Sequence, residues 1–224
     1  MFPLFDFIPY VAVIGDIVES KKLKDRKAVQ EKLSSVLNDI NIKYGEDMAS
    51  KFMITLGDEF QGLLRAGIHT MEIVEKIERE MHPEKIRFGI GVGKITTGIN
   101  PDIPLGADGP AYYNARRMID KIKAIEKKKM EPKSNMKIEI EDNSDISELM
   151  NAVFSLNAVL KAKWTDRQRK IINTYLKCGG TQSDAAKELG INQSNVQKAL
   201  SNADFYSYQK ALDAVTKILS NVKG

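Results

Sequence analysis

The order in which strand-like and helix-like segments alternate constrains the fold of this chain more than any other feature of its sequence. Four apolar, β-branched runs have the length of strands: residues 10–18, 51–56, 60–64 and 86–93. Apolar residues recur at helical spacing over 25–44 and 68–81. The resulting order, β-α-β-β-α-β, is that of the split βαβ or ferredoxin-like fold, so we predict a mixed α/β (α+β) domain built on one sheet.

A further helix and an edge strand extend this pattern. Residues 111–127 carry apolar side chains on one helical face, and the segment 137–141, KIEIE, alternates as an edge strand does. Between them, the charged stretch 126–135 is predicted to be a solvated loop. The glycines of the strand 86–93 are interpreted as positions where a neighbouring helix or ligand approaches closely.

The chain divides after the last predicted strand, in the polar segment 142–145. We expect an α/β domain over residues 1–143 and a helical domain over 144–224. Residues 161–224 hold 11 Lys and Arg against 5 Asp and Glu, a net charge of +6, whereas the rest carries −2 of the total of +4. A basic domain on a nearly neutral body is typical of a nucleic-acid-binding appendage, although scattered surface charge would give the same excess.

Two short helical segments around a tight turn are the main feature of the second domain. After a helix over 165–177 that opens on a cap-like threonine, the pair 181–189 and 193–200 follows around the turn 190–192. The pair resembles the helix-turn-helix of sigma-factor-like and LuxR-like regulators. That resemblance implies a second helix in the major groove of DNA.

The polar residues of that second helix are the predicted contacts to base edges: Gln193, Ser194, Asn195, Gln197 and Lys198. Phosphate contacts are expected from three basic residues of the preceding helix: Arg167, Arg169 and Lys170. The alternative is a helix-turn-helix used only for protein contact, since its second helix has one cation. A last amphipathic helix, over 205–222, is expected to pack this module or to dimerise it.

Acidic residues end the first strand and occupy the predicted hairpin turn. Asp16 lies at the end of strand 10–18, and Asp58 and Glu59 lie between strands 51–56 and 60–64. A split βαβ sheet brings these positions to the same edge, and converging carboxylates suit Mg²⁺ or Mn²⁺ with a triphosphate. Ordinary turn chemistry is the alternative, because Asp after Gly is common in loops.

Four motifs occur in the order seen in class III nucleotide cyclases: GDIV at 15–18, TLGDEF at 55–60, RFGIGVG at 87–93, and Gly109 followed by ARR at 115–117. The hairpin also resembles the GGDEF hairpin of diguanylate cyclases, with Leu56 in place of the first glycine. Over essentially its full length the chain resembles the SatD family, whereas the cyclase resemblance covers about residues 10–120. It implies that Asp16 and Asp58 bind metal, that the ligand is a nucleoside triphosphate, and that the protein is a homodimer.

The chain departs from the cyclase pattern at two places. Ile54 stands where class III adenylate cyclases carry a base-reading lysine. Their transition-state Asn and Arg are four residues apart on a helix, whereas Asn114 and Arg117 are three apart here. Both spacings share a helix face, so the resemblance supports metal and phosphate binding better than cyclisation.

The segment 104–115 is predicted to form a turn before a helix whose free N–H groups hold a phosphate beside the acidic edge. An ordinary loop-to-helix junction is the alternative. The expected nucleotide-binding residues are Gly15, Ile17, Gly57, Asp108 and Tyr112. The expected catalytic residues are Asn114, Arg116 and Arg117.

The acidic edge, the cyclase-like motifs and the helix-turn-helix are together compatible with three functions. The first is a DNA-binding regulator whose cyclase-like domain binds a nucleotide and a divalent metal. The second is an active nucleotidyl cyclase or another metal-dependent nucleotide-transforming enzyme, and the third is a non-catalytic dimerisation scaffold. Cys178 is the single cysteine, so a disulfide framework is excluded. No signal peptide or run of about 20 apolar residues is seen, and we expect a cytoplasmic protein without a membrane span.

Overall fold

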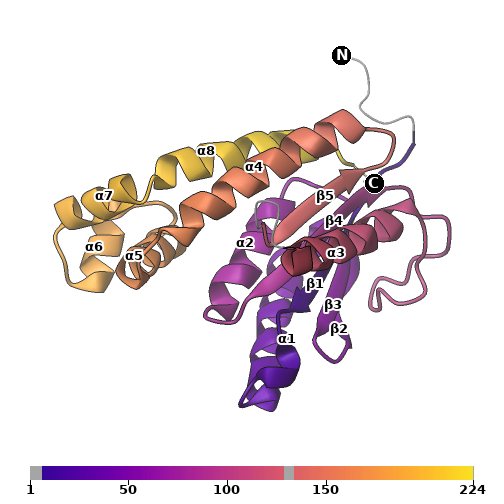
Figure 1. Cartoon of the computed structure of the whole chain (residues 1–224), viewed down its shortest axis with the longest axis horizontal. Coiled ribbons are helices and arrows are strands. Elements are labelled where there is room, and N and C mark those ends of the chain that lie inside the picture. Colours follow the sequence, from indigo (N-terminus) through magenta and orange to yellow (C-terminus); the bar gives the residue numbers. More distant parts are fainter. Residues whose placement is uncertain (1–6, 129–133, 224) are drawn as a thin grey trace.

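The computed structural model describes residues 7–128 and 134–223. A sheet packed between helices forms one part of the molecule, and two long helices lead from it to a cluster of three shorter ones (Figure 1). The five strands are β1 (Tyr10–Ile17), β2 (Met48–Leu56), β3 (Glu59–Leu64), β4 (Ile86–Gly93) and β5 (Met136–Ile140). The helices of the sheet part are α1 (Arg26–Lys43), α2 (Thr70–Met81) and α3 (Pro110–Lys128).

The strand order is β2-β3-β1-β4-β5. The central strand β1 pairs antiparallel with both β3 and β4, while β5 adds to β4 in parallel. The predicted βαββαβ order and the predicted edge strand are confirmed, and β5 forms that edge. The predicted loop over 126–135 begins later than expected, because α3 continues to Lys128; residues 129–133 lie outside the described part.

The two faces of the sheet are covered by different helices. On one face, apolar side chains of α1 and α2 such as Leu37 and Ile77 pack on alternate strand residues such as Val13. On the other face α3 lies alone, with Ala115 and Ile119 against Ala12 and other small strand residues. Alternation along each strand therefore buries both of its sides.

Strand glycines allow α3 to lie close to the sheet. A Cβ on Gly89 would fall 2.1 Å from the carbonyl oxygen of Ala115, and one on Gly91 would fall 2.0 Å from that of Ala111. No side chain fits at these distances, so the backbone of the helix rests directly on β4. The interpretation of these residues as points of close approach is confirmed.

The remaining helices are α4 (Ser144–Ala162), α5 (Asp166–Lys177), α6 (Gln182–Leu189), α7 (Gln193–Asn202) and α8 (Phe205–Leu219). The expected domain boundary falls in the turn between β5 and α4. Asn151 of α4 donates its Nδ2 hydrogen to the carbonyl oxygen of Ile138 and accepts from its N–H group, at 2.8 and 2.9 Å. Because Phe154 joins the buried cluster of the sheet, α4 closes the core beside β5.

The last helix, α8, runs back along α4 to the sheet part (Figure 1). Beyond its end, the carbonyl oxygen of Val222 accepts a hydrogen bond from the N–H group of Gly67 at 3.1 Å, and Lys223 bridges to Ala66. The helix is thus attached at its far end to the segment that leads into α2. None of the helices in the described residues is both long and apolar enough to cross a membrane.

Candidate functional site

Three charged residues lie side by side on the three central strands of the sheet, near the end of β1. Asp16 of β1 stands opposite Glu59 of β3 on one side and Arg87 of β4 on the other. Side chains of directly opposed residues project to the same face of a sheet. That face is the one covered by α3, because Ala12 and Ile14, on the same side of β1 as Asp16, pack against α3.

Basic and acidic side chains of α3 complete an ion-pair network with these strand residues. Nη1 of Arg87 lies 2.5 Å from Oδ2 of Asp16, and Nη2 lies 2.7 Å from Oε2 of Glu126. Nζ of Lys123 lies 3.3 Å from the other oxygen of Asp16. Together with the Arg116–Glu59 pair described next, these residues are called the ion-pair network.

Arg116 and Glu59 form a two-pronged ion pair at one end of the network. The two guanidinium nitrogens lie 2.5 and 2.6 Å from the two carboxylate oxygens. This hydrogen bonding raises the pKa of Arg116. Burial alone would lower the pKa of Arg87, but its hydrogen bonds to Glu126 and Asp16 outweigh that effect and raise it. Both guanidinium groups therefore stay charged.

The hairpin turn lies against the end of β1. The N–H group of Ile17 donates to the carbonyl oxygen of Asp58 at 3.2 Å, and the Ser20 hydroxyl donates to the Asp58 carboxylate. Gly57 takes a left-handed φ of 65°, and its carbonyl oxygen accepts from the side-chain amide of Gln30. The expected meeting of turn and strand end is present, although the carboxylates of Asp16 and Asp58 hold different partners.

These carboxylates do not fit a divalent cation as they are arranged. Both oxygens of Asp16 face cations, both oxygens of Glu59 bind Arg116, and Asp58 accepts the Ser20 hydroxyl. A metal ion at Asp16 would lie beside two like charges in a site where water is scarce, since the Asp16 side chain is 10% exposed. Across residues 7–128 and 134–223, no three or more His, Cys, Asp or Glu side chains form a metal-binding group.

The start of α3 does not lie beside these acidic residues, although Gln61, two residues after Glu59, donates to the carbonyl oxygen of Pro104 at 3.1 Å. The helix α3 crosses the sheet against the direction of β4: a Cβ on Gly93 would be 2.9 Å from the N atom of Ala111, whereas Glu126 pairs with Arg87. Six residues of strand, about 20 Å, separate Arg87 from Gly93. The expected phosphate site at the start of α3 is therefore at the opposite end of the sheet.

Asp108 occupies that helix start with its own carboxylate. One oxygen accepts from the N–H group of Gly109 at 3.0 Å, and the other accepts from the Tyr113 hydroxyl at 2.6 Å. An anion already lies where the phosphate was expected. Tyr112 is in the core under α3 and 7% exposed, where burial raises the pKa of its hydroxyl, so its ring has no open face for a base.

The three expected catalytic residues are divided between two places. Arg116 belongs to the ion-pair network. Asn114 donates to the carbonyl oxygen of Val92 at 3.1 Å and accepts from Arg117 at 2.5 Å, and Arg117 continues to Glu139 of β5 at 2.7 Å. This chain of contacts fixes α3 to β4 and β5 at a distance from Asp16. Gly15 and Ile17 have packing roles as well, since a Cβ on Gly15 would enter the ring of Phe60 and Ile17 is buried.

Lys123 and Glu126 were not predicted as site residues from the sequence. Their spacing from Arg116, seven and ten residues, places all three on one face of α3, the face that meets Glu59, Asp16 and Arg87 in turn. This spacing was the one feature of the sequence that could have indicated that the three residues act together. Its meaning depends on the register of the helix against the sheet, which the sequence leaves open.

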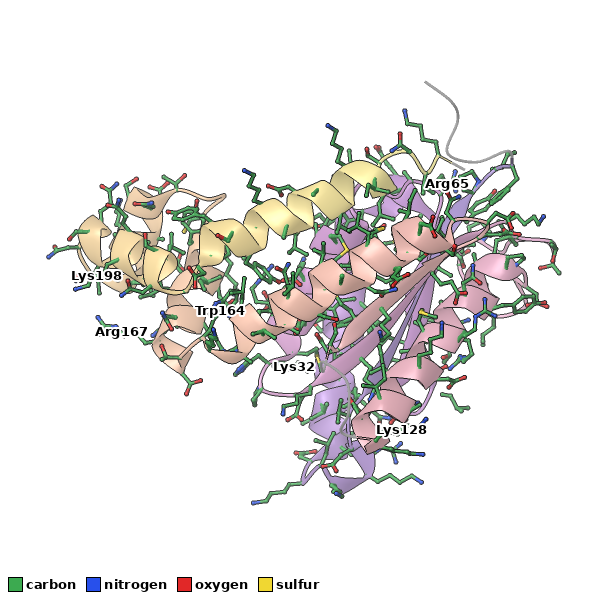
Figure 2. All side chains as sticks on the ribbon, turned by 45° about the horizontal axis from the view of Figure 1, so that its top comes forward. Lys32, Arg65, Lys128, Trp164, Arg167 and Lys198 are labelled. Carbon is green, nitrogen blue, oxygen red and sulfur yellow. The ribbon has the colours of Figure 1, made fainter. Side chains whose placement is uncertain are left out.

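The cluster α5–α7 presents the second candidate surface. The start of α5 carries a capping box between Thr165 and Gln168, and Gly190 ends α6 in the left-handed conformation at φ 65°. Val196 and Leu200 of α7 are buried, whereas the five predicted base-contacting residues of α7 are all exposed. Figure 2 shows Lys198 and Arg167 at the end of the molecule far from the sheet.

The three predicted phosphate-contacting residues differ in their surroundings. Arg167 and Lys170 are exposed. Arg169 donates to the carbonyl oxygen of Lys161 at 2.5 Å and lies 5.7 Å from the centre of the Trp164 ring. Its guanidinium group therefore caps the C-terminal end of α4. Arg167 and Lys170 are more accessible to a phosphate than Arg169 is.

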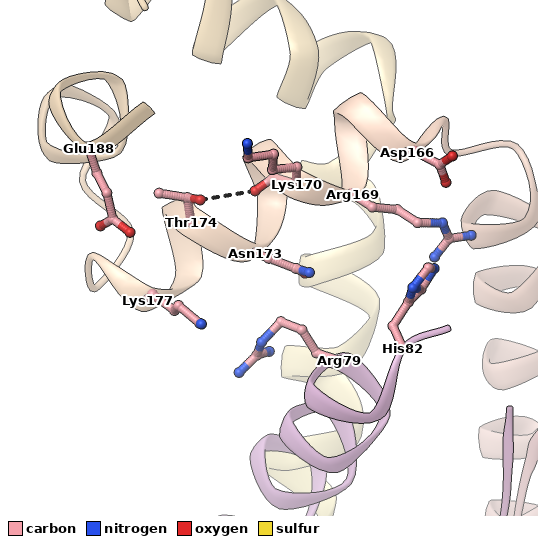
Figure 3. A pocket seen from close by; sticks show the side chains of 9 residues that line it. All are labelled: Arg79, His82, Asp166, Arg169, Lys170, Asn173, Thr174, Lys177 and Glu188. Carbon is pink, nitrogen blue, oxygen red and sulfur yellow. Dashed lines mark hydrogen bonds between the residues drawn. The ribbon is translucent and has the colours of Figure 1, made fainter. Parts of the chain in front are cut away.

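A shallow pocket of about 370 Å³ lies between the end of α2 and the helix α5 (Figure 3). Basic side chains from both helices line it, among them Arg79, Lys170 and Lys177, and two acidic residues, Asp166 and Glu188, line it as well. The excess of positive charge makes this pocket more favourable to anions than to cations.

In comparison with protein families, the chain matches the SatD family over residues 10–219. The chain therefore belongs to the SatD family. Among curated proteins, none matches it significantly.

Comparison with solved structures finds partial similarity to several cyclases. The guanylate cyclase domain of RhGC from Catenaria anguillulae, solved with GTP, has 20% identity and a TM-score of 0.39, covering 50% of this chain and 72% of its own. A bacterial light-regulated adenylyl cyclase has 14% identity and a TM-score of 0.43, with 58% and 75% covered. The guanylyl cyclase domain of the RhoGC fusion protein from Blastocladiella emersonii has 18% identity and a TM-score of 0.33, with 50% and 74% covered.

Proposed function

We propose that this member of the SatD family is a DNA-binding regulator that inserts α7 into the major groove. The observation that carries the proposal is the division of α7 into two faces. Val196 and Leu200 are fully buried, and the opposite side presents only polar residues able to bond base edges. The preceding helix α6 and the left-handed Gly190 hold α7 at the surface, as a helix-turn-helix requires.

Charge on the neighbouring helix supports the same conclusion. Arg167 and Lys170 of α5 are exposed and have no ion pair within residues 7–128 and 134–223. Cations placed beside a groove-binding helix contact phosphates and fix its register on the duplex. The role of the sheet part in this proposal is to hold the α5–α7 cluster and to respond to a ligand.

The test is a fluorescence anisotropy titration of mixed-sequence duplex DNA at several salt concentrations. We expect the logarithm of affinity to fall linearly with the logarithm of salt concentration, and the slope to decrease by about one in Arg167→Ala and in Lys170→Ala. Lys27→Ala, at an exposed position of α1, is the control and should leave the slope unchanged. No binding by the wild-type protein, or equal slopes in all variants, would contradict the proposal.

A second candidate function is nucleotide binding at the ion-pair network. The specific observation in its favour is the contact of the hairpin turn with the end of β1. The carbonyl oxygen of Asp58 accepts from Ile17, the residue after Asp16, and Asp16 stands opposite Glu59. Arg116 and Lys123 have side chains that are 44% and 38% exposed, so they are the cations that phosphate oxygens can reach by displacing carboxylates.

Calorimetric titration with ATP and GTP, with and without Mg²⁺ or Mn²⁺, tests this candidate. Binding without product supports a nucleotide-responsive regulator, and product above the background of Asp58→Asn supports an enzyme. The absence of binding heat with either nucleotide would end this candidate and leave the sheet part as a scaffold.

A further inference from the structure

One side of α4 is apolar although it faces solvent. Three large residues, Leu149, Leu156 and Val159, are 63%, 68% and 50% exposed, and Ala152 between them is exposed as well. The opposite side of the same helix holds Met150 and Phe154, which are buried against the sheet. The helix therefore has two apolar faces, of which one lacks a partner among the described residues.

The exposed face forms a straight line along the helix. Its members follow one another at intervals of four and three residues, which is the spacing of a coiled-coil seam. We call it the α4 stripe: Asp145, Leu149, Ala152, Leu156, Val159 and Lys163. It extends for about 27 Å at 1.5 Å per residue.

The two ends of the α4 stripe carry opposite charges. Asp145 lies at the start of the helix and Lys163 follows its last residue. Both side chains are exposed, and neither takes part in an ion pair within the described residues. A second α4 lying antiparallel would place Asp145 against Lys163 at both ends of the contact.

The apolar positions match under the same operation. An antiparallel pairing centred between Ala152 and Leu156 sets Leu149 opposite Val159 and Ala152 opposite Leu156, twice each. The stripe is thus complementary to itself about a two-fold axis, as an isologous interface requires. Unlike a parallel pairing, this one brings opposite charges together and sets the small Ala152 against the large Leu156.

We propose that the α4 stripe is the contact between two copies of this chain, packed as antiparallel α4 helices about a two-fold axis. The inference is independent of DNA binding and of any nucleotide. Burial of four apolar residues from each copy excludes water from the contact, and the two Asp145–Lys163 pairs fix its direction.

Analytical ultracentrifugation of the full chain from low to high micromolar concentration tests the proposal. We expect a reversible monomer–dimer equilibrium, with the dissociation constant raised at least about tenfold in Leu156→Glu, because two charges would enter the apolar contact. Ile42→Glu, at a position of α1 that is 75% exposed, is the matched control and should leave the equilibrium unchanged. A wild-type chain that stays monomeric, or an equal effect of both variants, would overturn the proposal.

A charge exchange separates a second copy from any other partner. We expect Lys163→Glu alone to weaken the dimer at low salt, and the double variant Asp145→Lys with Lys163→Glu to restore it, since the pairs are then reversed on both sides. Circular dichroism verifies that each variant is folded. Failure of the double variant to restore the dimer would exclude the antiparallel arrangement.

Discussion

The Nζ atom of Lys161, on α4, lies 3.4 Å from Oε1 of Glu75, on α2, so that a charged group joins the helical part to the sheet part. Lys161 also pairs with Glu78, and the hydroxyl of Tyr208 on α8 donates to Glu75. One cation therefore serves two carboxylates, and three helices meet at a polar contact in which the Lys161 side chain is 12% exposed.

Removing that cation should destabilise the whole chain. In Lys161→Met, the carboxylates of Glu75 and Glu78 remain in a poorly solvated place without a positive partner. We expect the free energy of unfolding to fall by about 3–5 kcal/mol, measured by urea denaturation. Lys210→Met, at an exposed position of α8, is the control and should change it by at most about 0.5 kcal/mol. Equal values for the two variants would show that the buried contact contributes nothing.

The stability contributed by Glu75 should depend on pH. Burial raises the pKa of Glu75 above its usual 4.5, because desolvation outweighs the attraction of Lys161. The folded chain then holds the proton more tightly than the unfolded chain, so the stability that Glu75 contributes is fully present below pH 4.5 and is lost as pH rises through the raised pKa. The variant Glu75→Gln carries an amide in place of the carboxyl group, so it lacks this pH-dependent contribution.

Relative to the wild-type protein, Glu75→Gln should therefore gain stability as pH increases from 4.5 towards neutrality. Thermal or urea unfolding at a series of pH values measures this difference. Glu31→Gln, at a position of α1 whose side chain is 68% exposed, should show no such trend. A difference that stays constant with pH would contradict the raised pKa.

The pair Arg87–Asp16 should show strong energetic coupling. Each single variant removes one of the two ion pairs of the remaining partner: in Arg87→Met, Asp16 keeps only Lys123, and in Asp16→Asn, Arg87 keeps only Glu126. We expect each to lower the free energy of unfolding by about 2–4 kcal/mol, and the double variant to lose clearly less than the sum. Additive losses in this double-mutant cycle would mean that the two groups act independently.

Enlarging a strand glycine should displace α3. In Gly91→Ala the new methyl group would meet the carbonyl oxygen of Ala111, which belongs to a helix backbone that cannot turn aside. We expect a loss of about 1–3 kcal/mol or more in unfolding free energy. Gly98→Ala is the control, since its Cβ would meet nothing within 4 Å. A neutral Gly91→Ala variant would show that the helix shifts easily.

Two neighbouring arginines of α5 should respond differently to substitution. Arg169→Ala removes the hydrogen bond to Lys161 and the contact with Trp164, so we expect a loss of about 1–3 kcal/mol in stability. Arg167→Ala should leave stability unchanged and weaken DNA binding. Parallel measurement of unfolding and of DNA affinity separates the two roles; a stable Arg169→Ala variant with weak DNA binding would reverse them.

Periodicity determined most of what could be predicted about the fold. The repeats of two and 3.6 residues placed the strands and helices of the sheet part correctly, and the order of those elements then fixed the pairing of β1 with β3. The helix α3 was predicted to end at residue 127, one residue early, because Lys128 was assigned to a charged loop although a lysine suits the C-terminal end of a helix.

The candidate site was harder to predict, because its composition depends on the direction of α3 across the sheet. Asp16, Glu59 and Arg116 were found from motifs, but Lys123 and Glu126 meet them only through the register of helix against strand. The same register carries Asn114 to β4 and Arg117 to β5. Motifs identify residues along the chain, whereas ion pairing is decided by long-range packing.

The attachment of α8 at both ends has a mechanical consequence. Its first turn packs through Phe205 on Trp164 and Tyr175, beside the α5–α7 cluster, and its far end is bonded to Gly67 about 22 Å away. Because α8 is attached at both ends, we expect a displacement of its first turn to move its far end as well. A tilt of the cluster would therefore act on the connection that begins at Arg65, whose N–H group donates to the carbonyl oxygen of Asp47 at the edge of the sheet.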